Sequence, residues 1–312
     1  MEAADPVAHR IEVSGMRVGF VGVGVMGAPM AQNMLKGGHT VLVYDTNRDA
    51  VEALVRAGAE GAANAKRLAA ACDVVITMLP TPAVVEAAVF GPDGILEGAA
   101  SGLVYIDMST GEPVLAQRLA RALGARGVVV IDCPVGRTQA HAAAGTLLLM
   151  AGGDRAAVER ARPVLMCMGK DLVYCGGPGM GQAMKLVNNM LASIVMQGTT
   201  EALTLGAKAG LSLETMLTVL TNTMARNAQL TDALPAKAFK GDFTPGFTVR
   251  LARKDVGLAV GLAQQLEVPV PLAALTLQLC SALVAGGYGG QDVGVILGAQ
   301  ADFLGVRIRL AE

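Results

Sequence analysis

A lysine and two asparagines open a long apolar stretch in the second half of the chain. Lys185, Asn188 and Asn189 follow the glycine-rich run 176–181 and stand among Met, Leu and Val. Residues three and four apart share one face of a helix, so the ammonium group and both amides are expected together. A lysine ammonium is charged at neutral pH and can hydrogen-bond an oxygen atom and give it a proton. These residues are therefore candidates for binding and protonating a substrate.

A glycine motif near the N-terminus indicates a second kind of chemistry. Gly22, Gly24 and Gly27 have the spacing G-x-G-x-x-G, between an apolar run at 16–21 and a helical stretch. In a dinucleotide site the first glycine allows a turn, the second lets a pyrophosphate approach, and the third permits close helix–strand packing. The start of the helix, with Val25 and Met26, would offer N–H groups to the phosphates.

Asp45 ends the next predicted strand and completes this motif. Its carboxylate would accept hydrogen bonds from the ribose hydroxyls and repel a 2′-phosphate, which favours NAD, as NADH, over NADP. Arg48 is near enough in sequence to soften that preference. Two alternatives stay open: a glycine turn that binds nothing, and Asp45 as a helix cap.

Two further loops follow predicted strands and are expected at the same sheet edge. Leu79 and Pro80 follow the strand 73–78, and Ser109 and Thr110 follow the strand 103–108. Ligands of open α/β sheets bind at the carboxyl ends of the strands, so these loops are candidate ligand contacts. The alternatives are stiffening by the prolines of the first loop and capping, by Ser109 or Thr110, of a helix that begins near Glu112.

The elements that must position these residues fall into two groups. Strands alternate with helices as far as residue 175, which predicts a mostly parallel sheet with helices on both faces. After Pro178 only helices are predicted, at 181–210, 212–225, 228–238, 249–267 and 271–286. The sequence therefore predicts a flexible extension (1–15), an α/β domain (16–178) and an all-α domain (179–312).

Composition excludes several classes of protein. The 312 residues carry a formal net charge of -1, which argues against broad nucleic-acid binding. No run approaches the roughly 18 apolar residues of a membrane span, and residues 1–15 lack the apolar core of a signal peptide. The five cysteines include no C-x-x-C pair, which favours reduced thiols in a cytoplasmic protein without a metal site.

Several motifs follow one another in a fixed order and spacing: Gly22–Asn33, Asp107–Thr110, Asp132–Val135, Gly145–Leu147, Gly152–Gly153, Gly179–Gly181, Lys185, Asn189 and Lys254–Asp255. Together they resemble the β-hydroxyacid dehydrogenases, over about residues 17–305. The resemblance implies a Rossmann-type doubly wound domain that binds NAD(P), an all-α C-terminal domain, and a homodimer or homotetramer. It further implies that Lys185 is catalytic, Asn189 orients the substrate, Ser109 contacts the substrate, and Thr110 and Lys254 lie on the cofactor side.

One segment departs from the common family pattern. Most members continue with Ser-Gly-Gly after Val135, whereas this chain has Gly136, Arg137 and Thr138. In this it is similar to the subgroup of 3-sulfolactaldehyde reductases, which form 2,3-dihydroxypropane-1-sulfonate. A guanidinium group and a hydroxyl suit the three oxygens of a sulfonate, and Asn188 and Asn189 would add donors. The expected substrate is therefore a small anionic aldehyde, reduced by NADH.

Other interpretations remain open at this point. A sister enzyme acting on a carboxylate would use succinic semialdehyde, tartronate semialdehyde or 3-hydroxyisobutyrate. A non-catalytic nucleotide-binding relative and an imine-reducing relative would normally lack the lysine at position 185. The alternative for Arg137 is a surface or interdomain ion pair.

Overall fold

The computed structural model describes residues 15–309, so of the predicted extension 1–15 only Gly15 lies within the described part. The chain divides into two compact units between Lys185 and Leu186. This division falls inside helix α9 (Met180–Lys208), whereas the predicted boundary at residue 178 lies just before that helix. The first turns of α9 belong with the first unit because they are bonded to its strand ends, as described below.

The first unit is built on one sheet with the strand order β3-β2-β1-β4-β5-β6-β8-β7, in which β9 pairs with β8. The strands from β3 to β6 in this order are parallel, β8 is antiparallel to β6 and β7, and β9 is parallel to β8. The strands are β1 (Arg17–Val21), β2 (Thr40–Tyr44), β3 (Glu60–Gly61), β4 (Val74–Thr77), β5 (Val104–Asp107), β6 (Val129–Asp132), β7 (Val135–Gly136), β8 (Leu147–Gly153) and β9 (Gly169–Gly176).

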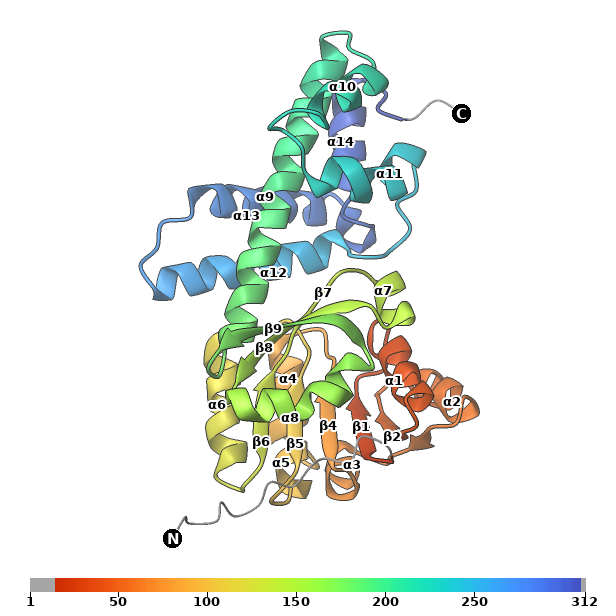
Figure 1. The fold of residues 1–312 in the computed structure, drawn as a ribbon. Coiled ribbons are helices and arrows are strands. Elements are labelled where there is room, and N and C mark those ends of the chain that lie inside the picture. The colour runs from red at the N-terminus through yellow and green to blue at the C-terminus, as the bar shows by residue number, and fades with distance from the viewer. Residues whose placement is uncertain (1–14, 310–312) are drawn as a thin grey trace. The chain divides into compact units, whose positions relative to one another are not determined.

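Helices cover both faces of this sheet (Figure 1). Successive strand residues point to opposite faces, so Val74 and Ile76 of β4 enter one core and Val75 enters the other. Helices α1, α2 and α8 contribute to the first core, and α3, α4 and α6 to the second, which confirms the doubly wound prediction. The helices are α1 (Gly27–Lys36), α2 (Arg48–Arg56), α3 (Ala65–Ala71), α4 (Pro82–Phe90), α5 (Ile95–Gly98), α6 (Pro113–Gly124), α7 (Gln139–Ala144) and α8 (Arg155–Met166).

The described part of the second unit is helical, as predicted, apart from one isolated bridge between Thr248 and Asp292. Its main core is apolar and includes Leu203, Leu234, Phe239 and Leu297. No helix within residues 15–309 is long and apolar enough to cross a membrane. Beyond α9 the elements are α10 (Leu213–Leu220), the π-helical turn η1 (Gln229–Ala233), α11 (Leu234–Ala236), η2 (Ala238–Lys240), α12 (Val249–Gln265), α13 (Pro271–Ala285), η3 (Tyr288–Gly290) and α14 (Val295–Leu304).

Two helix predictions in this unit were wrong in extent. The segment 228–238 is not one α-helix, because a π-helical turn is followed by a short helix containing Pro235 and by the non-helical backbone of Lys237. The helix predicted to reach residue 225 ends at Leu220. Beyond it the Thr221 hydroxyl and the Asn222 amide donate to the carbonyl oxygens of residues 217 and 218, which compete with continued helix.

Candidate active site

The glycine motif forms a tight loop between β1 and α1. Gly22 has a φ of +95°, and a Cβ at Gly27 would collide with the carbonyl oxygen of Gly22, so the fold itself requires both glycines. A Cβ at Gly24 would meet no protein atom within 4 Å. Helix α1 starts after Met26, which makes no side-chain cap hydrogen bond. An open glycine beside an uncapped helix start fits the approach of a pyrophosphate, with Val25 in the same turn.

Asp45 stands at the end of β2 and is bonded to this loop. Its Oδ2 accepts a hydrogen bond of 2.8 Å from the backbone N–H of Val23, and its Oδ1 accepts one of 2.8 Å from Asn47. The alternative that Asp45 caps a helix is wrong, because the cap of α2 is the side chain of Asn47. The carboxylate fixes the glycine loop to β2, and its contact with a ribose stays a prediction.

The loops after β4 and β5 are joined through Ser109. Its side chain is fully buried, and its hydroxyl oxygen accepts a hydrogen bond of 2.9 Å from the backbone N–H of Leu79. The carboxylate of Asp107 accepts from the Ser109 N–H at 3.0 Å. The Ser109 hydroxyl thus has partners inside the fold, and its predicted contact with a substrate remains untested.

These loops also place Pro80 and Thr110 at the carboxyl ends of adjacent parallel strands, since Thr77 pairs with Asp107 in the sheet. The N-cap position of α6 is Glu112, which makes no side-chain cap bond. The alternative that Ser109 or Thr110 caps this helix is therefore wrong. Contacts of Leu79, Pro80 and Thr110 with a cofactor stay predictions.

Gln182, on the first turn of α9, is a site residue that the sequence did not reveal. It is 1% exposed; its Oε1 accepts from the N–H of Gly111 at 2.8 Å, and its Nε2 donates to the carbonyl oxygen of Ser109 at 2.9 Å. One side chain thereby fixes the loop after β5 against α9. The only signal in the sequence was a polar residue within an apolar helix.

Asp132, at the end of β6, was also missed as a site residue. Its Oδ1 accepts from the N–H of Gly179 at 2.8 Å and its Oδ2 from the N–H of Gln182 at 2.9 Å. The side chain is 3% exposed, and burial raises its pKa to about 6, with the charge of Asp107 adding to the rise and both N–H bonds opposing it. Asp132 therefore holds the start of α9.

Lys185 is turned toward the chain that leaves β6. Its Nζ donates a hydrogen bond of 2.6 Å to the carbonyl oxygen of Val135, the first residue of β7. The predicted specificity segment, residues 136–138, follows directly along the chain. The ammonium group is therefore bonded, within the first unit, to the residue that directly precedes this segment, although Lys185 is far from it in sequence.

Within that segment each residue has a partner inside the first unit. Gly136 pairs with Leu148 in the sheet, and the Thr138 hydroxyl lies 2.9 Å from His141 Nδ1. Arg137 has a φ of +78°, which is uncommon for a residue other than glycine.

The guanidinium group of Arg137 makes two short contacts. Nη1 donates to the carbonyl oxygen of Thr146 and Nη2 to Oδ2 of Asp171, both at 2.6 Å. Arg137 therefore forms an ion pair, and its partner lies inside the same unit. A role in binding the head group of a substrate stays a prediction.

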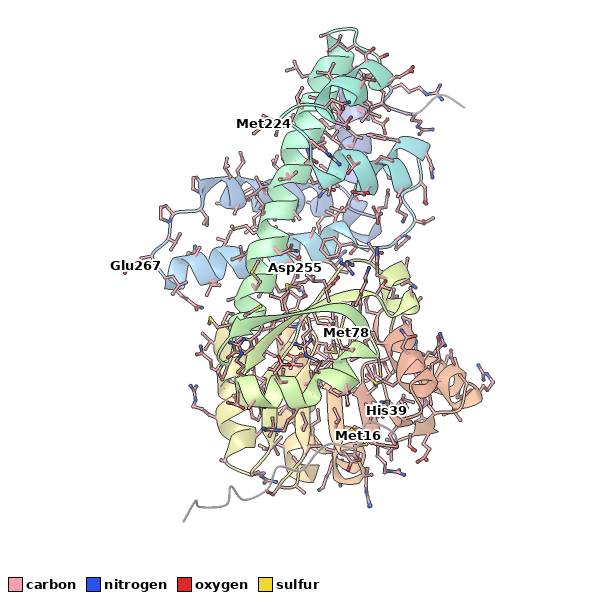
Figure 2. The ribbon with its side chains drawn as sticks, viewed as in Figure 1. Met16, His39, Met78, Met224, Asp255 and Glu267 are labelled. Carbon is pink, nitrogen blue, oxygen red and sulfur yellow. The ribbon has the colours of Figure 1, made fainter. Side chains whose placement is uncertain are left out.

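In the second unit, Asn188 and Asn189 begin a series of polar contacts. Asn188 Nδ2 donates to Asn189 Oδ1 at 2.9 Å, and Asn189 Nδ2 donates to Asp255 Oδ2 at 2.6 Å. Lys254 Nζ lies 3.0 Å from Asp255 Oδ1. Asp255, labelled on α12 in Figure 2, is 2% exposed and orients Asn189 and Lys254 together. Contacts of these residues with substrate or cofactor stay predictions.

Comparison with known proteins identifies the class of enzyme. Residues 17–177 match the NAD binding domain of 6-phosphogluconate dehydrogenase, and residues 179–299 match the NAD-binding domain of NADP-dependent 3-hydroxyisobutyrate dehydrogenase. The chain is 42% identical over 280 residues to the 3-sulfolactaldehyde reductase of Escherichia coli (strain K12), covering 90% of this chain and 94% of that protein.

Two 3-hydroxyisobutyrate dehydrogenases are also similar. That of Pseudomonas aeruginosa is 40% identical over 270 residues, covering 85% of this chain and 91% of that protein. The solved structure of the Mycobacterium tuberculosis enzyme with L-serine has a TM-score of 0.85 and 31% identity, covering 92% of this chain and 99% of the other. With the glycine loop and Lys185 in place, the chain belongs to the β-hydroxyacid dehydrogenase family and is a nicotinamide-dependent oxidoreductase.

Proposed function

We propose that this oxidoreductase uses NADH to reduce 3-sulfolactaldehyde to 2,3-dihydroxypropane-1-sulfonate. The observation that carries the proposal is the contact between Lys185 and Val135, because it holds an ammonium group beside the segment that departs from the family's Ser-Gly-Gly pattern. The 42% identity to an enzyme named 3-sulfolactaldehyde reductase supports the same substrate.

Lys185 would act as general acid. NADH, when bound, supplies the hydride that reaches the aldehyde carbon. The ammonium group would hydrogen-bond the aldehyde oxygen and donate a proton as negative charge develops on it. The residues proposed to hold the nucleotide are Gly22, Gly24, Val25, Met26, Gly27, Asp45, Leu79, Pro80 and Thr110, with Lys254 proposed from the second unit.

The head group of the substrate would be recognised by Arg137 and Thr138. A guanidinium carries five N–H donors, so the bonds to Thr146 and Asp171 do not exhaust it. Ser109, Gly136, Asn188 and Asn189 are proposed as further substrate contacts from the family resemblance. A sulfonate keeps its charge across the physiological pH range, which suits a permanently charged partner.

A second candidate is reduction of a semialdehyde that carries a carboxylate. The ion pair with Asp171 favours it, because that carboxylate offsets the charge of Arg137 and weakens its preference for a strong anion. The Pseudomonas relative named 3-hydroxyisobutyrate dehydrogenase, at 40% identity, is compatible with this alternative.

The choice of NADH over NADPH rests on Asp45, whose carboxylate lies at the end of β2. A structure of similar fold, with 27% identity and a TM-score of 0.81, is described in complex with NADP+, and the ratio of kcat/KM for NADH to that for NADPH is the test of the preference. We also infer a homodimer or homotetramer from the family resemblance.

The test is a panel of aldehydes with purified full-length protein. Initial rates of NADH oxidation would be measured with 3-sulfolactaldehyde, succinic semialdehyde and tartronate semialdehyde, each over a range of concentrations. We expect kcat/KM for 3-sulfolactaldehyde to exceed that of each carboxylate by at least about tenfold. A carboxylate that equals or exceeds it would replace the proposal by the second candidate. Lys185→Ala protein, assayed in parallel, measures any contaminating reductase.

A further inference from the structure

The start of helix α9 is held by a carboxylate from a distant part of the chain. Asp132, at the end of β6, accepts from the N–H groups of Gly179 and Gln182, which lie 47 and 50 residues further along. Oδ1 accepts from Gly179 and Oδ2 accepts from Gln182. The N–H groups at a helix start need partners from outside the helix, and a negative charge there also interacts favourably with the helix dipole.

The space around this carboxylate is shaped by two glycines. A Cβ at Gly152 would lie 2.6 Å from Asp132 Oδ1, and a Cβ at Gly181 would lie 2.9 Å from Oδ2. Both strand β8 and helix α9 can therefore approach Asp132 only because these residues lack side chains. This close packing confines the carboxylate to its observed position.

Bonds at both ends fix the segment 132–135 against the start of α9. At one end Asp132 binds the N–H groups of Gly179 and Gln182; at the other, Lys185 Nζ binds the carbonyl oxygen of Val135. The side chain of Gln182, between these ends, holds the loop after β5 through Gly111 and Ser109.

We propose that the Asp132 carboxylate is a positioning residue for the reaction, because it fixes the first turn of α9 and so keeps the Lys185 ammonium group at the Val135 carbonyl. This inference rests on the proposed role of Lys185. A carboxylate can accept from both N–H groups, whereas a protonated carboxyl or an asparagine amide has only one carbonyl oxygen to offer. Loss of the ionised form leaves one buried N–H without a good acceptor and loosens the helix start.

The surroundings of Asp132 make this role sensitive to pH. The titratable groups that interact with it are Asp107 at the end of β5, Cys133 beside it and Cys175 on β9. Burial raises the pKa of Asp132 to about 6. The turnover of the enzyme should therefore fall as the pH drops through about 6, while a sulfonate or a neutral aldehyde does not change its charge there.

The test compares Asp132→Asn with a matched control, both in the full chain. Misplacing a catalytic group by about 1 Å costs about a hundredfold in rate, so we expect kcat to fall by that order while KM for NADH changes less than about twofold. The loss of activity near pH 6 should also disappear in the variant. The control is Asp154→Asn, since Asp154 caps α8 with a bond of 2.8 Å to the N–H of Ala157. The control should keep both the wild-type kcat and the wild-type pH profile.

Several outcomes would overturn the inference. One is a wild-type kcat in Asp132→Asn. Another is an Asp132→Asn enzyme that still loses activity near pH 6, as the wild type is expected to do. If Asp132→Asn does not fold, the pH dependence of kcat in the wild-type enzyme is the test. A constant kcat from pH 8 to pH 5 in folded protein contradicts the positioning role of Asp132. Failure of the proposed function has a different signature: Lys185→Ala would then keep its turnover. An inactive Lys185→Ala with a fully active Asp132→Asn overturns only the positioning role.

Discussion

The ammonium nitrogen of Lys185 lies 2.6 Å from the carbonyl oxygen of Val135, so a helix side chain is bonded to the residue that directly precedes the segment expected to select the substrate, residues 136–138. A carbonyl oxygen is a neutral partner, and it orients the ammonium group without cancelling its charge. A carboxylate in that place would offset the charge needed to stabilise an alkoxide.

Replacing Lys185 by alanine should lower kcat by at least about 10²–10⁴-fold, the usual contribution of a general acid. The Kd for NADH should stay nearly unchanged, because the glycine loop is on other elements. Steady-state rates and NADH fluorescence titration measure the two quantities. Lys208→Ala is the control, since Lys208 is on the same helix and likewise donates to a carbonyl oxygen, that of Leu304. Wild-type turnover in Lys185→Ala would remove the general-acid role.

Arg137→Ala should raise KM for 3-sulfolactaldehyde at least about tenfold while leaving KM for an uncharged aldehyde nearly unchanged. Asp171→Asn should do the reverse and lower KM for the sulfonate, because it removes the carboxylate that offsets the guanidinium charge. Arg162→Ala, which breaks an exposed pair with Glu159, is the control. Equal effects of Arg137→Ala on charged and uncharged aldehydes would show that Arg137 does not bind the head group.

Gly24→Ala tests whether a ligand approaches the glycine loop. The added methyl group meets no protein atom within 4 Å, so the melting temperature should stay within about 2 °C of wild type. The Kd for NADH should rise at least about tenfold, equivalent to about 1.4 kcal/mol, measured by titration calorimetry. Gly124→Ala, also in open space at the end of α6, should leave the Kd unchanged. Unchanged NADH binding in Gly24→Ala would place the pyrophosphate elsewhere.

Asp45→Asn should shift the cofactor preference toward NADPH. The substitution removes the negative charge that repels a 2′-phosphate but keeps a carbonyl oxygen able to accept from Val23. We expect the ratio of kcat/KM for NADH to that for NADPH to fall at least about tenfold. Asp49→Asn removes the same charge from the exposed first turn of α2 and should not change the ratio. A ratio that is equal in wild type and Asp45→Asn would mean that Asp45 does not contact the ribose.

Asp132 should also make the free energy of unfolding depend on pH. As the pH falls, this free energy should rise, whereas the activity should fall. Because its folded-state pKa is raised to about 6, the fold favours the neutral form. The associated stabilisation is fully present below about pH 4 and is lost as the pH rises through about 6. The free energy of unfolding of wild type, relative to Asp132→Asn, should therefore rise by on the order of 1 kcal/mol from pH 8 to pH 5. Urea titrations at both pH values measure this, and a constant difference would contradict it.

Much of the fold could be predicted because central strands such as β1, β4 and β5 are largely buried and helices such as α1, α2 and α6 are amphipathic, so each leaves a local pattern. The strand β7 and the helix α7 were missed because two and six residues are too few to show a period. The glycine loop and Lys185 could be found from residue type and spacing. The partners Asp132, Gln182 and Asp171 could not, because their bonds join segments far apart in sequence.

Helix α9 runs without a break across the division between the two compact units. This continuity limits where the chain can be truncated or joined to the chain of a relative. A fragment that ends at residue 178 would remove both N–H donors of the Asp132 carboxylate. A chimera that joins relatives in the glycine-rich run would combine Gln182 and Lys185 of one parent with the strand ends of the other. Truncations and domain exchanges should therefore place their junction inside α9, after Lys185. Lys185 and the strands of the first unit then come from the same parent chain.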